Sequence, residues 1–270
     1  MSGISTDDIM QWSLDLAGLT EVPADSAIYV PGHDIRRVLF GIDVGTADLL
    51  LARQLGVDLV IAHHPADALQ HFPRIFERHV ALMRSEGIPE EEARAAIQEL
   101  TERWQDRLHS ANYDHVVSVA KLLRMPFMNI HNPLDEYGRQ RMTAAVAGIA
   151  PHEPLSAVLA ALNTIDEIRT APTAVEIAVG APESPAGRIK VVHGAGTNGG
   201  YPVATAYFRH GIRTVIYIHL ATDAKWKLRQ DAMGQVIVVG HLAGDLTGIQ
   251  PFANLLRERG LEVTGFSGVQ

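Results

Sequence analysis

Apolar runs of strand length alternate along the chain with stretches whose apolar residues recur at helical spacing. The opening segment places Ser5 and Asp8 in capping-box spacing ahead of such a periodic stretch, which predicts an N-terminal helix. A strand at 37–43, a helix at 47–55 and a strand at 57–62 are expected next. Strand, helix and strand joined by short links predict a right-handed crossover and a parallel sheet.

A helical insertion at about 70–115 interrupts this alternation. Pro89 and the glutamates at 90–92 stand at the start of a long amphipathic pattern, and a second helix is expected at 113–123. A strand at 126–130 then restores the alternation. We interpret the insertion as a cap over a pocket or as an oligomer contact.

The middle of the chain is expected to contain a strand at 142–149, a helix at 153–165 and a hairpin made of 174–180 and 188–194. The remaining expected elements are helices at 202–210, 224–233 and 247–259 and strands at 212–219, 235–240 and 261–266. No low-complexity linker marks a domain boundary.

Two segments share one pattern at a constant offset. Gly56 and His64 in the first correspond to Gly211 and His219 in the second, each pair 155 residues apart. The match favours two related lobes, while a chance match between generic helix-strand units remains the alternative.

Composition narrows the function classes. The 270 residues are 47% hydrophobic and carry a net charge of −8, with a pI near 5.9. Such a chain can bury a sizeable core, and it has no basic stripe for nucleic acid. The first twenty residues lack the basic start of a signal peptide, and no apolar run approaches the roughly 20 residues of a membrane span. We therefore expect a soluble, cytoplasmic protein without nucleic-acid or membrane partners.

The chain has no cysteine, which excludes disulfides, thiol nucleophiles and thiolate metal sites. Any metal must be held by nitrogen and oxygen atoms, for which 13 histidines and 31 acidic residues are available.

His63 and His64 stand where the strand at 57–62 ends, followed by Pro65. Successive strand side chains point to opposite faces, so the pair serves two different ions, or one ion if the chain turns there. Ligands of open parallel sheets bind beyond the carboxyl ends of strands, which is the position of this pair. The alternative is a pair of histidines that hydrogen-bond to backbone carbonyls.

Two other strand ends carry comparable residues. His241 and Asp245 follow the strand at 235–240 and share a face if a helix begins there, although a lone H-x-x-x-D is also common on surfaces. His131 and Asp135 follow the strand at 126–130, where a turn of the Asx type around Asn132 and Pro133 is the alternative.

Together these strand ends offer ligands for two divalent ions: His63, His64, Asp135, His241 and Asp245. Two such ions would carry four positive charges against the two negative charges of the carboxylates. About two positive charges remain to attract a hydroxide and an anionic substrate. Zinc, iron and manganese all suit nitrogen and oxygen ligands.

A glycine-rich segment is a further candidate for a binding site. Gly194, Gly196 and Gly199 form a G-x-G-x-x-G motif between a strand and a helix, with Asp223 as a possible ribose ligand. The motif lies late in the chain, so a dinucleotide site is the weaker interpretation. A loop whose backbone N–H groups bind a substrate phosphate at the rim of the metal site is the favoured one, with a structural loop as the alternative.

With these residues identified, the chain resembles the GTP cyclohydrolase I type 2-like family, also called the Nif-three-like family. The resemblance is carried by DLVIAHHP, by HNPLD in place of the family's H-x-N-L-D, by the glycine-rich segment, and by VVGHLAGD in place of its strand-G-H-x-x-[ST]-E. It covers most of the chain outside about 70–115.

The resemblance implies two similar three-layer α/β lobes, at 1–140 and 141–270, with a two-metal centre between them and assembly into a homohexameric ring. By residue matching, the five residues above become the metal ligands, and His131 orients a ligand or acts on substrate. Two departures concern the site: Asp245 replaces a bridging glutamate, and HLATD at 219–223 replaces a T-G-E element, which gives His219 or Asp223 a possible site role.

The sequence therefore predicts a two-metal hydrolase of a small heterocyclic or phosphorylated metabolite, in which His131 or His219 transfers a proton. A non-catalytic metal-binding scaffold that acts through protein partners is the main alternative. A nucleotide-dependent oxidoreductase is the third, and tight binding of NAD to the metal-free protein would support it.

Overall fold

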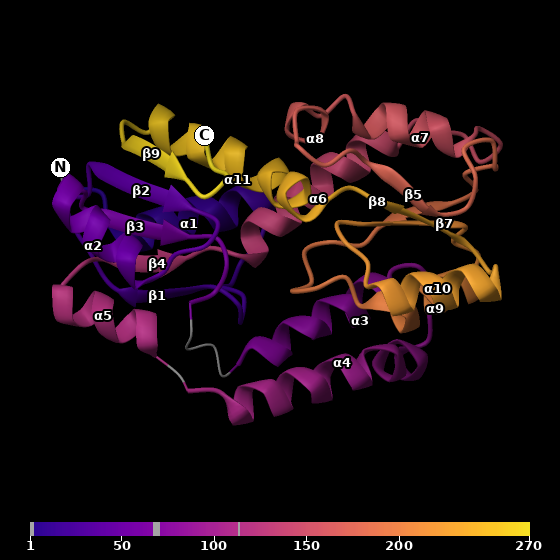
Figure 1. Ribbon diagram of the computed structural model, residues 1–270, viewed down its shortest axis with the longest axis horizontal. Helices are drawn as coiled ribbons and strands as arrows, with labels where there is room; N and C mark the ends of the chain where they lie inside the picture. Colours follow the sequence, from indigo (N-terminus) through magenta and orange to yellow (C-terminus); the bar gives the residue numbers. More distant parts are fainter. Residues whose placement is uncertain (1–2, 67–70, 113) are drawn as a thin grey trace. The chain divides into compact units, whose positions relative to one another are not determined.

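The computed structural model describes residues 3–66, 71–112 and 114–270 (Figure 1). It divides into two compact units. The first consists of Met1–Ile75, Asp106–Tyr137 and Gly248–Gln270, and the second of Phe76–Gln105 and Gly138–Thr247. None of the helices within the described residues is both long and apolar enough to cross a membrane.

The first unit is built on a five-stranded sheet. Its order is β1 (Ala27–Val30), β4 (Phe127–Asn129), β3 (Leu59–Ala62), β2 (Arg37–Gly41) and β9 (Glu262–Phe266). Only β1 is antiparallel to its neighbour; the other pairs are parallel. The helices wholly inside this unit are α1 (Thr6–Ala17), α2 (Thr46–Leu55) and α5 (His115–Leu123).

The predicted N-terminal helix is confirmed together with its capping box. Ser5 Oγ accepts from the Asp8 backbone N–H at 3.2 Å, and Asp8 Oδ2 accepts from the Ser5 backbone N–H at 2.8 Å. The predicted strands and helix between 37 and 62 are also present, as β2, α2 and β3. The helix expected at 113–123 is α5, and the first residue of that expectation lies outside the described residues.

The second unit contains a four-stranded sheet in the order β5 (Glu176–Val179), β8 (Gln235–Val238), β7 (Thr214–Tyr217) and β6 (Ile189–Val191). Its helices include α3 (Glu77–Arg84), α7 (Leu155–Leu162), α8 (Asp166–Arg169), α9 (Gly200–Arg209) and α10 (Thr222–Asp231). A 3-10 helix, η1 (Phe72–Phe76), leads into α3. Three helices have residues in both units: α4 (Glu90–Ser110), α6 (Asn132–Val146) and α11 (His241–Glu258).

The two sheets repeat one topology. The orders β1-β4-β3-β2 and β5-β8-β7-β6 correspond strand by strand, and each begins with an antiparallel edge strand. Both edge strands shift register at the same place, between Ile28 and Val30 and between Ile177 and Val179. The strands β3 and β7 begin at Leu59 and Thr214, which keeps the offset of 155 found in the sequence.

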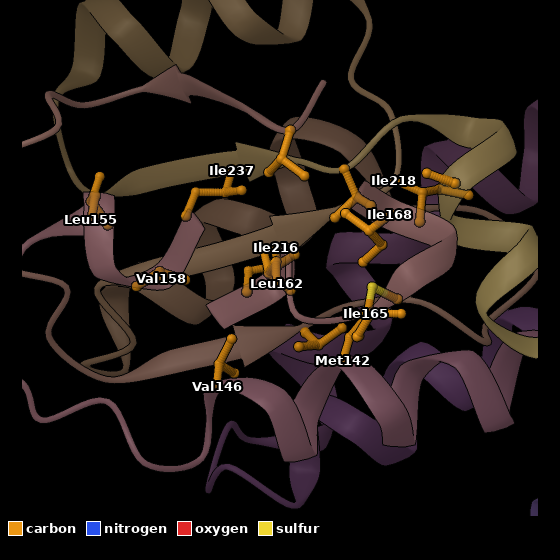
Figure 2. Packing of buried hydrophobic residues seen from close by; sticks show 14 of the residues in the cluster. Met142, Val146, Leu155, Val158, Leu162, Ile165, Ile168, Ile216, Ile218 and Ile237 are labelled. Carbon is orange, nitrogen blue, oxygen red and sulfur yellow. The ribbon is translucent and has the colours of Figure 1, made fainter. Parts of the chain in front are cut away.

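The core of the second unit lies between its sheet and the helices α6, α7 and α8 (Figure 2). Figure 2 shows Met142 and Val146 of α6 among the side chains that fill it, with Leu162 of α7 and Ile216 of β7. Each such side chain contributes about 1.5–3 kcal/mol by leaving water.

The strand expected at 142–149 is wrong, because these residues continue helix α6 and then turn. Met142 and Val146 are four residues apart and both face the core, which is the spacing of one helix face. The intervening alanines fit a helix as well as a strand, so their alternation with larger residues carried little information.

The hairpin expected from 174–180 and 188–194 is also wrong. Both strands exist, as β5 and β6, but β8 and β7 lie between them in the sheet. The turn-rich link instead bonds to the start of α7, where the Leu155 backbone N–H donates to the Ser184 carbonyl at 2.9 Å. Two further differences are the unpredicted edge strand β1 and the start of α11 at His241 rather than at 247.

Helices α6 and α11 approach each other closely at Gly248. A Cβ atom added to Gly248 would lie 1.9 Å from the Leu134 carbonyl oxygen, which is backbone and cannot rotate away. The absence of a side chain therefore permits this approach.

We expect Gly248→Ala to lower the free energy of unfolding by about 1–3 kcal/mol, as overpacking of a core does, although alanine normally stabilises a helix relative to glycine. Gly148→Ala is the matched control, because an added Cβ there meets nothing within 4 Å. Denaturant unfolding measures both. Equal stability of the two variants would contradict the close approach.

Helix α3 of the insertion is anchored to the glycine-rich loop. Arg78 Nε donates to the Gly194 carbonyl at 2.8 Å. The neighbouring His79 is fully buried, and its burial lowers the pKa of the imidazole to about 4. The neutral ring is therefore the form that the folded state accommodates.

The pKa of His79 is lower in the folded state than its ordinary value of 6.5, so the unfolded chain binds the extra proton first. Its contribution to stability is complete above pH 6.5 and is lost as the pH falls through 4, by at most about 3 kcal/mol. We expect His79→Met to unfold with a weaker pH dependence than wild type between pH 7 and 4. His109→Met, at an exposed position of α4, should keep the wild-type dependence.

Candidate metal centre

Three histidine rings converge at the carboxyl ends of two neighbouring strands in the first unit. His63 and His64 follow β3, and His131 follows the parallel neighbour β4. Their possible ligand atoms lie within 4.8 Å of one another. The ring centroids are 4.8 Å apart for His63 and His131 and 5.2 Å apart for His63 and His64.

The adjacent imidazoles converge because the strand has already ended. Regular pairing of β3 stops at Ala62. The backbone N–H of His63 then donates to the Gly41 carbonyl at 2.9 Å and that of His64 to the Ile42 carbonyl at 2.9 Å, so both residues bend toward the end of β2. The chain therefore bends at this pair, and the two ring centroids lie 5.2 Å apart.

Each of the three rings uses its Nδ1 atom in a hydrogen bond to a fixed oxygen. The partners are the Ile130 carbonyl for His63 at 3.0 Å, Asp43 Oδ1 for His64 at 2.8 Å and Asp25 Oδ2 for His131 at 2.7 Å. These oxygens are acceptors, so Nδ1 carries the proton in each neutral ring and Nε2 keeps its lone pair. Metal-ligating histidines are usually held in this way.

Asp135 brings a carboxylate to the same place. It lies in the first turn of α6 and is buried, with Oδ1 3.2 Å from His63 Nε2 and Oδ2 3.6 Å from His131 Nε2. The Asx-type turn considered for Asn132 and Pro133 is not observed, because α6 begins there. Proline suits the first turn of a helix, and the helix dipole favours a carboxylate in that turn.

The second unit carries the other predicted pair. Helix α11 begins at His241, and His241 Nε2 lies 3.4 Å from Asp245 Oδ2. The carboxylate is buried and the imidazole is about half exposed. The two side chains therefore share one helix face, as their spacing predicted.

His219 follows β7 and lies beside His241, with ring centroids 4.9 Å apart. Asn198 donates from Nδ2 to the His219 ring at 2.9 Å, and its Oδ1 accepts from the Ile218 backbone N–H at 3.2 Å. Partial burial, followed by the proximity of His241, lowers the pKa of His219. The ring is therefore neutral at pH 7 and able to accept a proton.

The glycine-rich loop forms the link between β6 and α9. Gly194, Gly196 and Gly199 have φ angles of 68°, 79° and 75°, in the left-handed region that favours glycine. Gly199 is the N-cap of α9 and, with Asp223 of α10, borders a cavity. Gly194 and Gly196 are outside that cavity lining, so they shape the loop.

Sequence reasoning missed two carboxylates that orient the histidine rings. Asp25 precedes β1, a strand that the sequence pattern did not reveal. Asp43 lies two residues after the end of β2, and that position at a strand end was a signal that was available in the sequence.

The donor set suits divalent metal ions. Imidazole nitrogens with their proton fixed on the far side and buried carboxylate oxygens are ligands for zinc, iron and manganese, and no thiolate is present to favour a softer site. A buried carboxylate among imidazoles is stabilised when an ion supplies positive charge.

Comparison with solved structures gives a similar chain that matches over its full length. The crystal structure of a NIF3 superfamily protein from Sphaerobacter thermophilus is 49% identical, with 100% of each chain covered and a TM-score of 0.95. No protein-family model matches the sequence. No curated protein matches it either.

More distant structures share the fold. Reduced HcgD from Methanocaldococcus jannaschii is 11% identical with a TM-score of 0.60, covering 97% of this chain and 98% of that one. A Bacillus cereus protein related to NIF3 is 9% identical with a TM-score of 0.55, covering 97% and 96%.

If Asp43 orients a ligand, Asp43→Ala should weaken zinc binding by about tenfold to a hundredfold, because the His64 ring loses its Nδ1 partner. Competition with a chromogenic chelator measures the affinity. Asp43 is largely exposed, so the fold should be unaffected. Asp15→Ala, at an exposed position of α1, is the control and should bind zinc as wild type does.

Proposed function

Because the chain belongs to the NIF3 superfamily, we propose that it is a divalent-metal-dependent hydrolase of a small metabolite. The observation that carries the proposal is the common orientation of three imidazoles, each with Nδ1 bonded to a fixed oxygen. A chance cluster of histidines would not need the same nitrogen, Nδ1, hydrogen-bonded to an oxygen in every ring.

The proposed ligands come from both units. His63, His64 and Asp135 belong to the first, and His241 and Asp245 to the second. Five ligands of this kind suit two divalent ions of zinc, iron or manganese. The side chain of Asp245 is one methylene shorter than that of the glutamate in the family pattern.

Divalent ions would supply Lewis acidity and lower the pKa of a water molecule. The chain itself supplies proton-handling groups. The buried Asp25 carboxylate accepts a hydrogen bond from His131 Nδ1 at 2.7 Å and so fixes the orientation of this ring. His219 is neutral at pH 7 because its pKa is lowered, and so can take a proton from substrate or water.

A non-catalytic metal-binding scaffold is the second candidate. Exposed leucines on α2 and α5, among them Leu51, Leu55 and Leu122, favour it because they leave apolar surface for another protein chain. The homohexamer implied by the family resemblance stays a prediction.

Metal content tests the ligand assignment. We expect two ions per chain in wild type and a loss of bound metal in His63→Ala and in His241→Ala, because each variant removes one proposed ligand. His152→Ala, at an exposed position, is the control and should keep the wild-type content. Two ions in both ligand variants would show that the assignment is wrong.

Turnover separates the two candidate functions. We expect metal-loaded wild type to convert at least one compound of a metabolite pool followed by mass spectrometry, and Asp135→Ala to convert none. A pool left unchanged by metal-loaded wild type would favour the scaffold. Retained conversion by metal-free Asp135→Ala would rule out metal-dependent hydrolysis at this site.

A further inference from the structure

A cavity of about 210 Å³ lies inside the second unit, and all of its lining residues belong to that unit. One wall is helix α4 of the insertion, through Ala96 and Leu100. The opposite wall combines the glycine-rich loop and the starts of α9 and α10, through Tyr201, His219 and Lys227. The lining thus joins apolar side chains with a few polar groups, as small-molecule sites do.

The size of the cavity limits its occupant. Pockets for drug-sized ligands measure about 300–1,000 Å³, so a cavity of 210 Å³ holds roughly one ring system with a substituent. A dinucleotide does not fit within it. The G-x-G-x-x-G loop that borders the cavity is therefore better explained by a small ligand than by NAD.

The ionic side chains at the cavity do not by themselves set the sign of its charge. Lys227 forms no ion pair within the described part of the chain, and its Nζ lies 5.8 Å from the centroid of the Tyr201 ring. Arg103 also borders the cavity and is paired with Glu99 at 2.5 Å, while Asp223 adds a second carboxylate. The four ionic side chains cancel, which leaves other groups to decide the sign.

Those groups are the starts of α9 and α10. Both helices have ten residues, both begin at the cavity, and neither N-cap residue, Gly199 or Ala221, makes a side-chain capping bond. Two helix starts without side-chain caps add partial positive charge and backbone donors to a cavity whose ionic side chains cancel, and they therefore favour an anionic group on the ligand.

The cavity is connected to the proposed chemistry through His219. This ring lines the cavity on one side and contacts His241, a proposed metal ligand, on the other. We propose that the cavity is the substrate-recognition site and binds a small ring compound that carries one anionic group, phosphate or carboxylate. The proposal rests on the proposed hydrolase function for the role of the ligand, but not for its binding.

Helix α4 then acts as a specificity element. It is held against the second unit by ion pairs, from Glu92 to His210 at 2.8 Å and to Arg209 at 3.4 Å. The side chain of Leu100 lines the cavity from this wall. An apolar ring would pack against it while the anionic group faces Lys227 and the helix starts.

Binding of simple probes by the full-length, metal-free protein tests the site. The probes are phenyl phosphate, benzoate, benzamide, inorganic phosphate and NAD, measured by isothermal titration calorimetry. We expect phenyl phosphate or benzoate to bind at least tenfold more tightly than neutral benzamide, inorganic phosphate or NAD. The stronger of the two ring anions identifies the anionic group.

Two variants test whether the preferred probe binds in the cavity. Leu100→Trp fills the apolar side, and Lys227→Gln removes the cation; each should weaken binding of the preferred ring anion at least tenfold. The matched control for the first is Glu102→Trp on the outer face of α4. The matched control for the second is Lys225→Gln on α10, because Lys225 is paired with Glu176 of β5. Both controls should bind as wild type does. Lys227 is exposed, so its variant tests the site even if Leu100→Trp fails to fold.

Several results would overturn the proposal. They are no binding of either ring anion, equal binding of benzamide, equal binding of inorganic phosphate, NAD as the tightest ligand, or unchanged binding by Lys227→Gln. The metal proposal fails separately. Zinc-loaded samples that contain no bound ion but still bind phenyl phosphate would reject the metal centre and keep the cavity site.

Discussion

The structure of the candidate site depends on one constraint, the fixing of each imidazole by a hydrogen bond at Nδ1. The acceptors stand at the ends of the strands: the Ile130 carbonyl after β4, Asp43 after β2 and Asp25 before β1. A shift of any strand by one residue would move its acceptor and release its ring. Strand register thus determines which nitrogen each ring presents, and the sheet core that sets the register also sets the chemistry.

The repeated topology allows side chains at equivalent positions of the two sheets to be compared. By the pairing registers, the position of Asp43 after β2 corresponds to that of Gly194 after β6, and His64 corresponds to His219. The first sheet therefore places a carboxylate beside its histidine where the second has a glycine-rich loop. Asn198 of that loop replaces the carboxylate as the partner of His219. A neutral partner does not favour a charged imidazole, in agreement with the lowered pKa of His219.

Many of the strands and helices could be predicted from the sequence, because the spacing of apolar residues indicates which face of an element is buried. The offset of 155 residues predicted the correspondence of β3 and β7, and the spacing of His241 and Asp245 predicted one helix face. The errors have a common cause. A strand pattern does not state its partner, so the segments at 174–180 and 188–194 were paired as neighbours although β8 and β7 separate them.

The orienting carboxylates escaped prediction for a related reason. Asp25 lies more than one hundred residues from His131, and its strand β1 is short and only partly buried, so it has no strong alternating pattern. Partners that are fixed by long-range pairing leave no local signal in a single sequence. The ligands themselves were visible because strand ends can be located from one segment alone.

The helical insertion does not belong to the repeated topology of the two sheets. Helices α3 and α4 have no counterpart in the repeat, yet they contribute the fully buried His79 beside the glycine-rich loop and one wall of the cavity. A histidine at the surface of a helix is tolerated in its charged form, whereas the buried His79 is accommodated as the neutral ring. The insertion is therefore packed into the unit through this residue. The packing of α3 on the loop fixes the backbone from which α9 starts. The part of the chain that departs most from the repeat therefore shapes the pocket, which is where members of a common fold are expected to differ in substrate.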